Sequence, residues 1–425
     1  MIGRKLGLGV GVTALALAAA APSSSGAAAE RARPPLAASV DSLSAPGALV
    51  ADQGRHGGFG QATLTAFAAL PAATFVPASD PSGAALGGTP SNGVTPPFAD
   101  QPVQGFSGVL HNSDGTFDVL SDNGYGNKAN SGDFVLRIQR IAADFAHNTV
   151  DVVGGISLTD PNGFVPFPLT RPDRVLTGSD FDVESIVRAN DGTYWLGDEF
   201  GPWLLHFDRA GRLLQAPIAT PDVRAPENPA GSPNLPSSKG FEGMAFSPNG
   251  GKLYPLLEGT VAGDPAGSLR MFEYNLVAGG YTGQHWIYQL DDPANAIGDA
   301  IAVDNDRFLV IERDGGQGDA AKVKKIYLAD KRDRDHDGQL DKTLVADLLN
   351  LANPHHIAGF GDPFRFPFQT IEDVVILDDN TLGVLNDNNF PFSSGRTPGK
   401  PDNDEFITIR LTDRLHADKR ILERR

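Results

Sequence analysis

The chain has 425 residues, of which 52 are acidic and 35 are basic, so its formal charge is −17. A protein that neutralises nucleic-acid phosphates usually presents a basic face, so this balance argues against nucleic acid as a partner. The absence of cysteine excludes disulfides, thiolate zinc sites and cysteine nucleophiles, and the 49 glycines and 32 prolines favour many short elements over a helical bundle.

The N-terminus has the pattern of an export signal. Arg4 and Lys5 precede an apolar stretch over residues 6–21, and small residues follow it. A charged start, an apolar middle and small residues before the cleavage point are typical of a secretory signal peptide; the alternative is a permanent membrane anchor. We therefore expect a signal peptide over residues 1–29 and a secreted, extracellular protein.

The remaining chain divides into a short leader and one large domain. Residues 30–50 are rich in Ala, Ser and Pro, which predicts a flexible leader, and residues 51–425 form the domain. No later stretch approaches the ~20 uninterrupted apolar residues of a membrane-spanning helix, so we expect no span in the mature chain. We also expect a monomer.

Ahead of the repeated part of this domain lies a strand-like run, Thr63 to Leu70. Five segments of the domain then repeat one pattern: a short apolar run, a turn rich in Asn, Asp or Gly, and a second β-rich run. They occupy residues 105–122, 184–198, 242–258, 299–312 and 372–387. Each is the signature of a β-hairpin.

Further strand-like runs follow most hairpins, at residues 203–208, 269–276, 322–328 and 406–411. Four strands per unit, repeated around a ring, predict an all-β fold: a β-propeller with five four-stranded blades. The last blade lacks a fourth strand, which the run Thr63 to Leu70 could supply, so that the ring closes without an exposed sheet edge.

Two alternatives to this architecture stay open. There are six blades if one of two loops rich in Pro and Phe, residues 160–177 and 350–370, hides a degenerate blade. A β-sandwich whose segments are similar by chance is the other alternative.

Acidic residues stand at equivalent ends of these hairpins. Because the two strands are antiparallel, the start of the first and the end of the second lie on the same side, opposite the turn. We therefore expect nine carboxylates to meet at one mouth of the central channel: Glu184, Glu242, Asp299 and Glu372 from first strands, and Asp122, Asp198, Glu258, Glu312 and Asp387 from second strands. Ser107 takes the acidic position in the first hairpin, and Glu199, Asp314 and Asp373 are adjacent.

Crowded like charges raise one another's pKa or require a cation, and oxygen ligands favour a hard ion such as Ca²⁺. The alternative is structural, since acids at strand ends also cap turns or pair with arginines such as Arg188 and Arg313. The candidates for catalysis are Glu184, Asp198, Glu199, Glu242, Glu312, Arg313 and Glu372.

A second candidate calcium site lies in one loop. Acids at alternate positions and a glycine for the sharp turn match the first half of a calcium loop, with Asp333, Asp335, Asp337, Gln339 and Asp341 as the expected ligands. Leu344 stands where such loops usually carry a bidentate glutamate. The alternative is a solvated acidic turn.

Short motifs at the hairpins resemble those of the phytase-like proteins described as having "esterase-like activity of phytase". The motifs are GFSG at 105–108, SDNG at 121–124, DVESI at 182–186, GDEFG at 197–201, GFEGM at 240–244 and ERD at 312–314. The similarity runs from about Thr63 to Leu411. It implies a secreted propeller hydrolase that acts on small-molecule phosphate or carboxylic esters, and propeller phytases use calcium to bind phosphate and activate water.

Three functions therefore stay open at the level of sequence. They are a calcium-dependent hydrolase of phosphoric esters, a carboxylic esterase on the same scaffold, and a non-enzymatic secreted binding propeller, since a fold alone does not establish catalysis. We expect an enzyme of the first class. The sequence has no G-x-S-x-G motif, which leaves an α/β-hydrolase serine site without support.

Overall fold

The computed structural model describes residues 58–424, and nearly all of its elements are strands. The predicted signal peptide and leader lie outside these residues. The one α-helix of the described part is α1 (Lys419–Leu422). None of its helices has the length and apolar character that crossing a bilayer would require.

The strands form three four-stranded antiparallel sheets and one eight-stranded sheet. The eight-stranded sheet comprises β2 (Phe106–His111), β3 (Phe117–Ser121), β4 (Arg137–Asp144) and β5 (Thr149–Ser157), with β18 (Asp373–Asp378), β19 (Thr381–Leu385), β20 (Asp404–Arg410) and β1 (Thr63–Leu70). The others are β6 (Val183–Arg188), β7 (Tyr194–Asp198), β8 (Trp203–Phe207) and β9 (Ile218–Ala219); β10 (Phe241–Phe246), β11 (Lys252–Leu257), β12 (Ser268–Asn275) and β13 (Gly280–Gln289); and β14 (Ala296–Ala302), β15 (Arg307–Arg313), β16 (Lys324–Asp330) and β17 (Asp341–Asp347).

All five predicted hairpins are present, as β2–β3, β6–β7, β10–β11, β14–β15 and β18–β19. Local chemistry explains their turns. In the second hairpin Gly192 has φ +83°, which favours glycine. The Asp191 carboxylate beside it accepts hydrogen bonds from the Thr193 N–H and hydroxyl at 2.9 and 2.7 Å. An aspartate that binds the backbone two residues ahead is a typical turn device.

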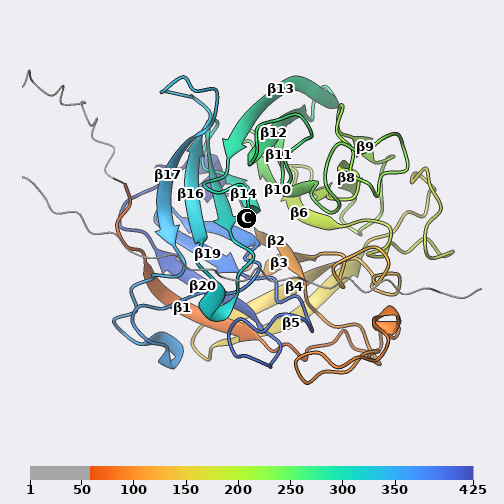
Figure 1. Ribbon diagram of the computed structural model, residues 1–425, viewed down its shortest axis with the longest axis horizontal. Coiled ribbons are helices and arrows are strands. Elements are labelled where there is room, and N and C mark those ends of the chain that lie inside the picture. Colours follow the sequence, from red (N-terminus) through yellow and green to blue (C-terminus); the bar gives the residue numbers. More distant parts are fainter. Residues whose placement is uncertain (1–57, 425) are drawn as a thin grey trace, which may run out of the picture. The chain divides into compact units, whose positions relative to one another are not determined.

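The first strands of the five hairpins surround one axis. Contacts run from β2 to β6, β10, β14 and β18, and back to β2. Figure 1 looks down this arrangement, with the C-terminal end of the chain near its middle. Every residue of β10 is buried, as expected for an inner strand with neighbours on both faces. The fold is all-β, as predicted, and its sheets are consistent with a propeller.

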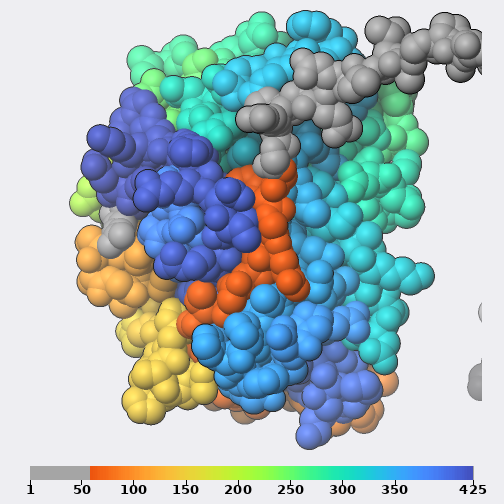
Figure 2. All heavy atoms as spheres, turned by 90° about the vertical axis from the view of Figure 1, so that its left-hand side faces the viewer, coloured from red at the N-terminus to blue at the C-terminus, as the bar shows by residue number. Residues whose placement is uncertain are grey.

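The predicted N-terminal strand is confirmed as β1. It pairs antiparallel with β20 from Thr63 opposite Arg410 to Leu70 opposite Asp404. A single parallel bridge between Ala69 and Thr149 joins it to β5, so that β2–β5 and β18–β20 form one eight-stranded sheet through β1. In Figure 2 the orange segment of β1 lies between dark-blue and lighter-blue parts of the C-terminal third.

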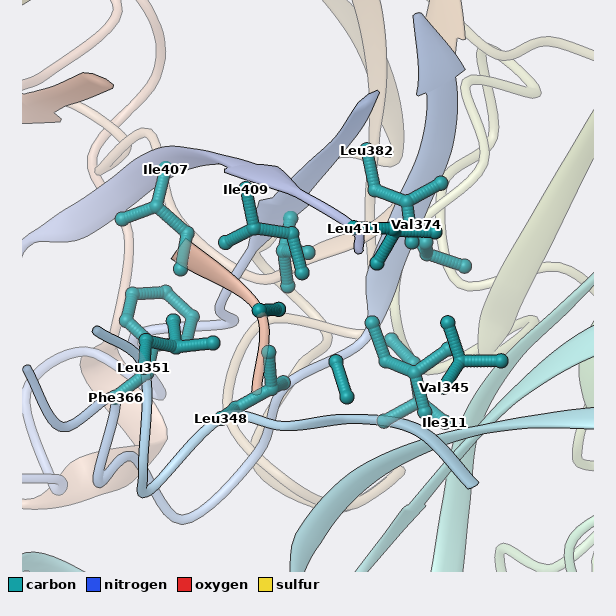
Figure 3. Packing of buried hydrophobic residues seen from close by; sticks show 14 of the residues in the cluster. Ile311, Val345, Leu348, Leu351, Phe366, Val374, Leu382, Ile407, Ile409 and Leu411 are labelled. Carbon is teal, nitrogen blue, oxygen red and sulfur yellow. The ribbon is translucent and has the colours of Figure 1, made fainter. Parts of the chain in front are cut away.

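A hydrophobic core fills the space between the last two sheets. Side chains of β18, β19 and β20 face Ile311 of β15 and Val345 of β17 (Figure 3). Leu348, Leu351 and Phe366, from the loop after β17, continue the same cluster. Fully burying one such side chain stabilises the fold by about 1.5–3 kcal/mol, so this layer holds neighbouring sheets at a defined separation.

Candidate metal centre

Eight carboxylates gather where the inner strands end on the side opposite the hairpin turns. We call this group the acidic cluster; its members are Asp122, Asp182, Glu184, Glu199, Glu242, Glu258, Glu372 and Asp387. All but Asp122, which is half-buried, are at most 8% exposed. Six of the nine acids predicted for a shared mouth are among them.

The backbone explains why these side chains converge. The N–H groups of Asp122, Glu199 and Glu258 donate to the carbonyls of Gly105, Asp182 and Gly240, each at 2.8 Å. The three acids therefore occupy the same position of three hairpins. In the fourth hairpin the corresponding residue is Arg313, which pairs with Ala296.

β-Bulges in the first strands of three hairpins coincide with the residues at the positions that face the acidic cluster. The pairing register of β6 with β7 shifts at Glu184, and that of β10 with β11 shifts at Glu242. In β14 the same shift falls at Gly298. A bulge adds one residue to one strand and re-aims its side chain, which suits a site at a strand end.

The structure corrects the predicted mouth at Asp198, Asp299 and Glu312. Each lies one residue from the equivalent position, which belongs to Glu199, Gly298 or Arg313. Because side chains alternate along a strand, a shift of one residue moves a side chain to the other face.

These three acids are engaged in other contacts. Asp198 accepts hydrogen bonds from the N–H groups of Asp182 and Gly201 at 2.9 and 2.7 Å. Asp299 accepts from Ala300 and Val374 at 2.7 and 3.0 Å. Glu312 accepts from the Tyr288 hydroxyl, the Asp291 N–H, the Asn295 amide and the Lys342 ammonium. Each of the three thus has hydrogen-bond donors of its own, as the structural alternative for such acids expects.

Two cations face the acidic cluster. Arg313, 8% exposed, has its Nη2 2.9 Å from a Glu372 oxygen and 3.4 Å from oxygens of Glu242 and Glu258. Lys239 forms an ion pair with Glu258, and its side chain is 41% exposed, which together with half-buried Asp122 marks the solvent side of the cluster. Eight carboxylates against two cations leave a large excess of negative charge.

The environment raises the pKa values of these acids. Burial is the main cause, and neighbouring carboxylates add to it. The pKa values of Asp122, Glu184, Glu199 and Glu242 lie well above the ordinary range. The pKa of Glu372 rises to about 8 through burial and the charge of Asp387. Such a group is stable only when it holds protons or a cation.

Two sets of carboxylate oxygens are close enough to share an ion. Oxygens of Asp182, Glu184 and Glu199 lie within 4.8 Å of one another, and so do oxygens of Glu199, Glu242 and Glu258. Oxygens on opposite sides of a Ca²⁺ ion are about 4.6–5.2 Å apart, given bonds of about 2.3–2.6 Å. The donors are all carboxylates, and Oε1 of buried Glu199 has no hydrogen-bond partner, so the residues fit a hard cation.

The predicted calcium loop joins β16 to β17. Oxygens of Asp333, Asp335 and Asp341 lie within 4.8 Å of one another. The Asp337 carboxylate instead accepts a hydrogen bond from the Gln339 N–H at 2.8 Å. The loop thus brings together three of the predicted ligands.

Ser107 and two acids that the sequence placed next to the predicted mouth, Asp373 and Asp314, differ in their contacts with the acidic cluster. Ser107 is buried and donates to Oε2 of Glu372 at 2.9 Å. Both oxygens of buried Asp373 lack a hydrogen-bond partner. The Asp314 carboxylate contacts Lys324 at 3.0 Å, apart from the cluster.

The opposite end of the inner strands is chemically different. A cavity of about 400 Å³ lies there, and its wall is mixed: Val109, Ile186, Met244 and Val374 contribute apolar surface. The polar part of the wall comes from His111, Arg188, Asn190, Arg209, Glu423 and Arg424. Among the described residues this wall has one carboxylate, that of Glu423, so the group of carboxylates that a cation site requires lies at the acidic end.

Two residues of the site, Asp182 and Lys239, were not predicted as site residues from the sequence. Asp182 stands two positions before Glu184 in the motif DVE, and residues two apart in a strand lie on the same face. This spacing was the sequence signal that could have placed Asp182 beside Glu184. Lys239 precedes the motif GFEGM, and nothing in the sequence marks it as a partner of Glu258. Arg313 was named as a candidate, and the structure places it inside the cluster.

A family model described as "Phytase-like: Esterase-like activity of phytase" matches residues 101–390. The chain belongs to this phytase-like family. Every member of the acidic cluster lies inside the matched range, whereas β1, β20 and α1 lie outside it. The resemblance stated from the motifs is thereby confirmed.

One curated relative of this phytase-like chain is an uncharacterized secreted protein of Arthroderma benhamiae, 29% identical over 190 residues. The match covers 34% of this chain and 37% of that protein. A GH43 β-1,3-galactosidase is similar in structure with a TM-score of 0.41 and 10% identity, over 72% of this chain and 56% of that one. A luciferin-regenerating enzyme gives 0.37 and 10%, over 72% and 77%. At these values the structural likenesses bear on neither substrate nor mechanism.

Proposed function

We propose that this protein is a secreted, calcium-dependent hydrolase of phosphoric esters whose small-molecule substrate binds at the acidic cluster. The observation that carries the proposal is the charge imbalance of that cluster, where, within the described residues, eight carboxylates face the two cations Arg313 and Lys239. Membership of a phytase-like family supports the reaction class. The secreted relative and the export pattern at residues 1–29 support the location.

The proposed scaffold is a five-bladed propeller closed by β1. The cyclic contacts of β2, β6, β10, β14 and β18 support the blade count, and the pairing of β1 with β20 supports the closure. On this reading the domain extends over residues 51–425, after the leader at 30–50, and the chain is a monomer.

Calcium reconciles an acidic site with an anionic substrate. A bare cluster would repel a phosphate ester, whereas bound Ca²⁺ reverses the local charge and can polarise phosphoryl oxygens and lower the pKa of a bound water. Glu184, Glu199 and Glu242 would hold the ion. Arg313 would neutralise Glu372, and half-exposed Lys239 stands on the solvent side, where it could donate to a phosphate oxygen.

The proposal is tested by phosphate release from phytate and from aryl phosphates, with calcium and with chelator. We expect release with calcium and its loss with chelator, and a loss of at least tenfold for Glu242→Gln. The matched control is Glu273→Gln, a buried glutamate that pairs with Lys252 outside the cluster. Equal turnover in calcium and chelator would exclude the metal mechanism.

A carboxylic esterase is the second candidate, favoured by one contact. The Ser107 hydroxyl donates to Glu372 at 2.9 Å, and a serine beside a carboxylate base is an arrangement for nucleophilic attack. Ser107→Ala separates the two reactions. If it abolishes acyl-ester cleavage while no aryl phosphate is hydrolysed by the unmodified protein, the esterase replaces the phosphatase. If neither ester class is cleaved, a binding propeller remains.

We also propose that the loop of Asp333, Asp335, Asp337, Gln339 and Asp341 binds calcium and stabilises the β16–β17 connection. The three converging carboxylates support this role. Calcium should slow proteolysis at the loop in the unmodified chain and have no effect on the double variant Asp333→Asn/Asp335→Asn. Equal protection of both chains would exclude the site.

A further inference from the structure

Glu199 belongs to both sets of converging oxygens. One set contains Asp182 and Glu184, and the other contains Glu242 and Glu258. Its position is rigid, because its N–H donates to the Asp182 carbonyl at 2.8 Å and Gly240 packs against its backbone. A Cβ at Gly240 would lie 2.5 Å from the Glu199 Cα, so β10 approaches this residue as closely as a glycine permits. Glu199 is thus fixed between the second and third sheets.

Two of the flanking carboxylates, those of Asp182 and Glu258, have partners that hold them, whereas Glu199 retains an oxygen without a partner among the described residues. Asp182 accepts from the Asn123 amide at 2.7 Å and from Ser238 at 3.2 Å. Glu258 pairs with Lys239 and contacts Arg313. Glu199 is 5% exposed, and its Oε1 has no hydrogen-bond partner within residues 58–424. A buried ionised oxygen without a partner is strongly unfavourable unless a ligand supplies one.

We propose that Glu199 bridges two divalent cations, one held with Asp182 and Glu184 and the other held with Glu242 and Glu258. The pair rests on the proposed function, whose calcium site it would form. Two-metal sites of this kind have ions about 3.5–4 Å apart, a separation that one bridging carboxylate spans.

Charge favours two ions over one. The two sets together contain five carboxylates, and in the part of the chain that the structure describes Lys239 is the ammonium that pairs with them. Two divalent ions and Lys239 balance five ionised carboxylates, whereas a single ion leaves two negative charges in a buried site. Arg313 also contacts Glu242 and Glu258 at 3.4 Å, but its nearest carboxylate is that of Glu372 at 2.9 Å, so the balance assigns its charge to Glu372. All donors are carboxylate oxygens, which suits Ca²⁺ or Mn²⁺.

The first test counts the ions bound by the full-length mature chain. Equilibrium dialysis against Ca²⁺ uses the background Asp333→Asn/Asp335→Asn, so that the loop does not contribute. We expect two ions per chain, one ion after Glu184→Gln, and none bound tightly after Glu199→Gln. The matched control Glu273→Gln keeps two. Fewer than two ions in the background chain, or one ion after Glu199→Gln, would overturn the bridge.

The second test needs no substitution in the cluster. Loading the same background chain with Mn²⁺ should give the electron paramagnetic resonance spectrum of an exchange-coupled pair, because the ions share a ligand. A spectrum of isolated Mn²⁺ at full occupancy would overturn the proposal, even if Glu199→Gln fails to fold. The two proposals can fail separately. If the ions form a coupled pair but no phosphate is released, the proposed activity is rejected and the bridge stands. If phosphate is released with one bound ion, the bridge is rejected and the activity stands.

Discussion

Arg313 occupies a position that carries an acid in three other hairpins. Its guanidinium lies between Glu242, Glu258 and Glu372, and burial keeps water from screening these contacts. The pKa of Arg313 is raised: burial alone would lower it, but the three carboxylates outweigh that effect. Removing one partner of a buried ion pair usually costs more than the pair contributes, since the remaining charge stays buried.

Arg313→Met should therefore lower the free energy of unfolding by about 3–5 kcal/mol in chelator at pH 8. Calcium should restore part of the loss, because a cation replaces the missing charge. Denaturant titration with and without calcium measures both effects. As a control, Arg171→Ala removes exposed pairs with Asp80 and Asp173 and should cost less than about 1 kcal/mol. Equal costs for both variants would contradict this account of the cluster.

A substitution at Gly240, the residue before β10, tests how closely this segment approaches Glu199. Gly240→Ala would place a Cβ 2.5 Å from the backbone of Glu199, so the two segments must separate. We expect a loss of stability of about 1–3 kcal/mol, typical of overpacking, and weaker calcium binding. Gly280→Ala is the control, because nothing lies within 4 Å of its Cβ. Calorimetric titration with calcium that finds identical affinities in both variants would argue against Glu199 as a ligand.

At the scale of elements, β1 joins distant parts of the chain. It pairs with β20, and Leu64, 1% exposed, packs into the core that includes Ile409 and Leu411. The family match covers residues 101–390, so β1 lies outside the matched range although it stands between β20 and β5 in the eight-stranded sheet. Covering an edge strand also protects the sheet from pairing with other chains.

Leu64→Ala should lower the free energy of unfolding by about 2–5 kcal/mol, because it leaves a cavity between β1 and the last sheet. Val277→Ala, at a side chain that is 91% exposed, should stay within about 0.5 kcal/mol of the unmodified protein. Thermal and denaturant unfolding measure both. A small effect at Leu64 would show that β1 contributes little to the sheet it completes.

At the scale of the whole molecule, buried acids make stability depend on pH. Burial raises the pKa of Asp198 to about 8 and that of Asp299 to about 7, from an ordinary value of 3.8. Burial raises the pKa of Asp387 to about 6, although hydrogen bonds from Asn389 and Thr370 lower it. A raised folded pKa means that the folded chain binds more protons than the unfolded chain between the two values. The stabilisation is complete below about pH 4 for these groups and is lost as pH rises through 6 to 8.

In chelator, the melting temperature should accordingly fall as pH rises from 5 to 8. Calcium should reduce this slope, since ions replace protons in the acidic cluster. Calorimetry at several pH values, with and without calcium, measures the difference. A melting temperature that rises over this range in chelator would have the wrong sign for buried acids with raised pKa values.

The hairpins were predictable because their information is local. Alternating apolar residues, a turn such as Asn190-Asp191-Gly192 and the next β-rich run lie within about fifteen residues, so the all-β class, the five hairpins and the strand at Thr63 to Leu70 follow from the sequence. The rule that antiparallel strands bring their outer ends together likewise predicts an acidic mouth. Membership of the phytase-like family was also readable from the short motifs.

The exact members of the cluster depended on tertiary structure. In β6 and β10 the bulge falls on a glutamate, but in β14 it falls on Gly298, so Asp299 turns away from the centre. The same offset selects Glu199 over Asp198 and Arg313 over Glu312. A bulge changes the facing of a residue without a distinct sequence signal, because it arises from how two strands pair. Likewise, only the packing of β10 against the end of β7 reveals that Glu199 is shared by two groups of acids.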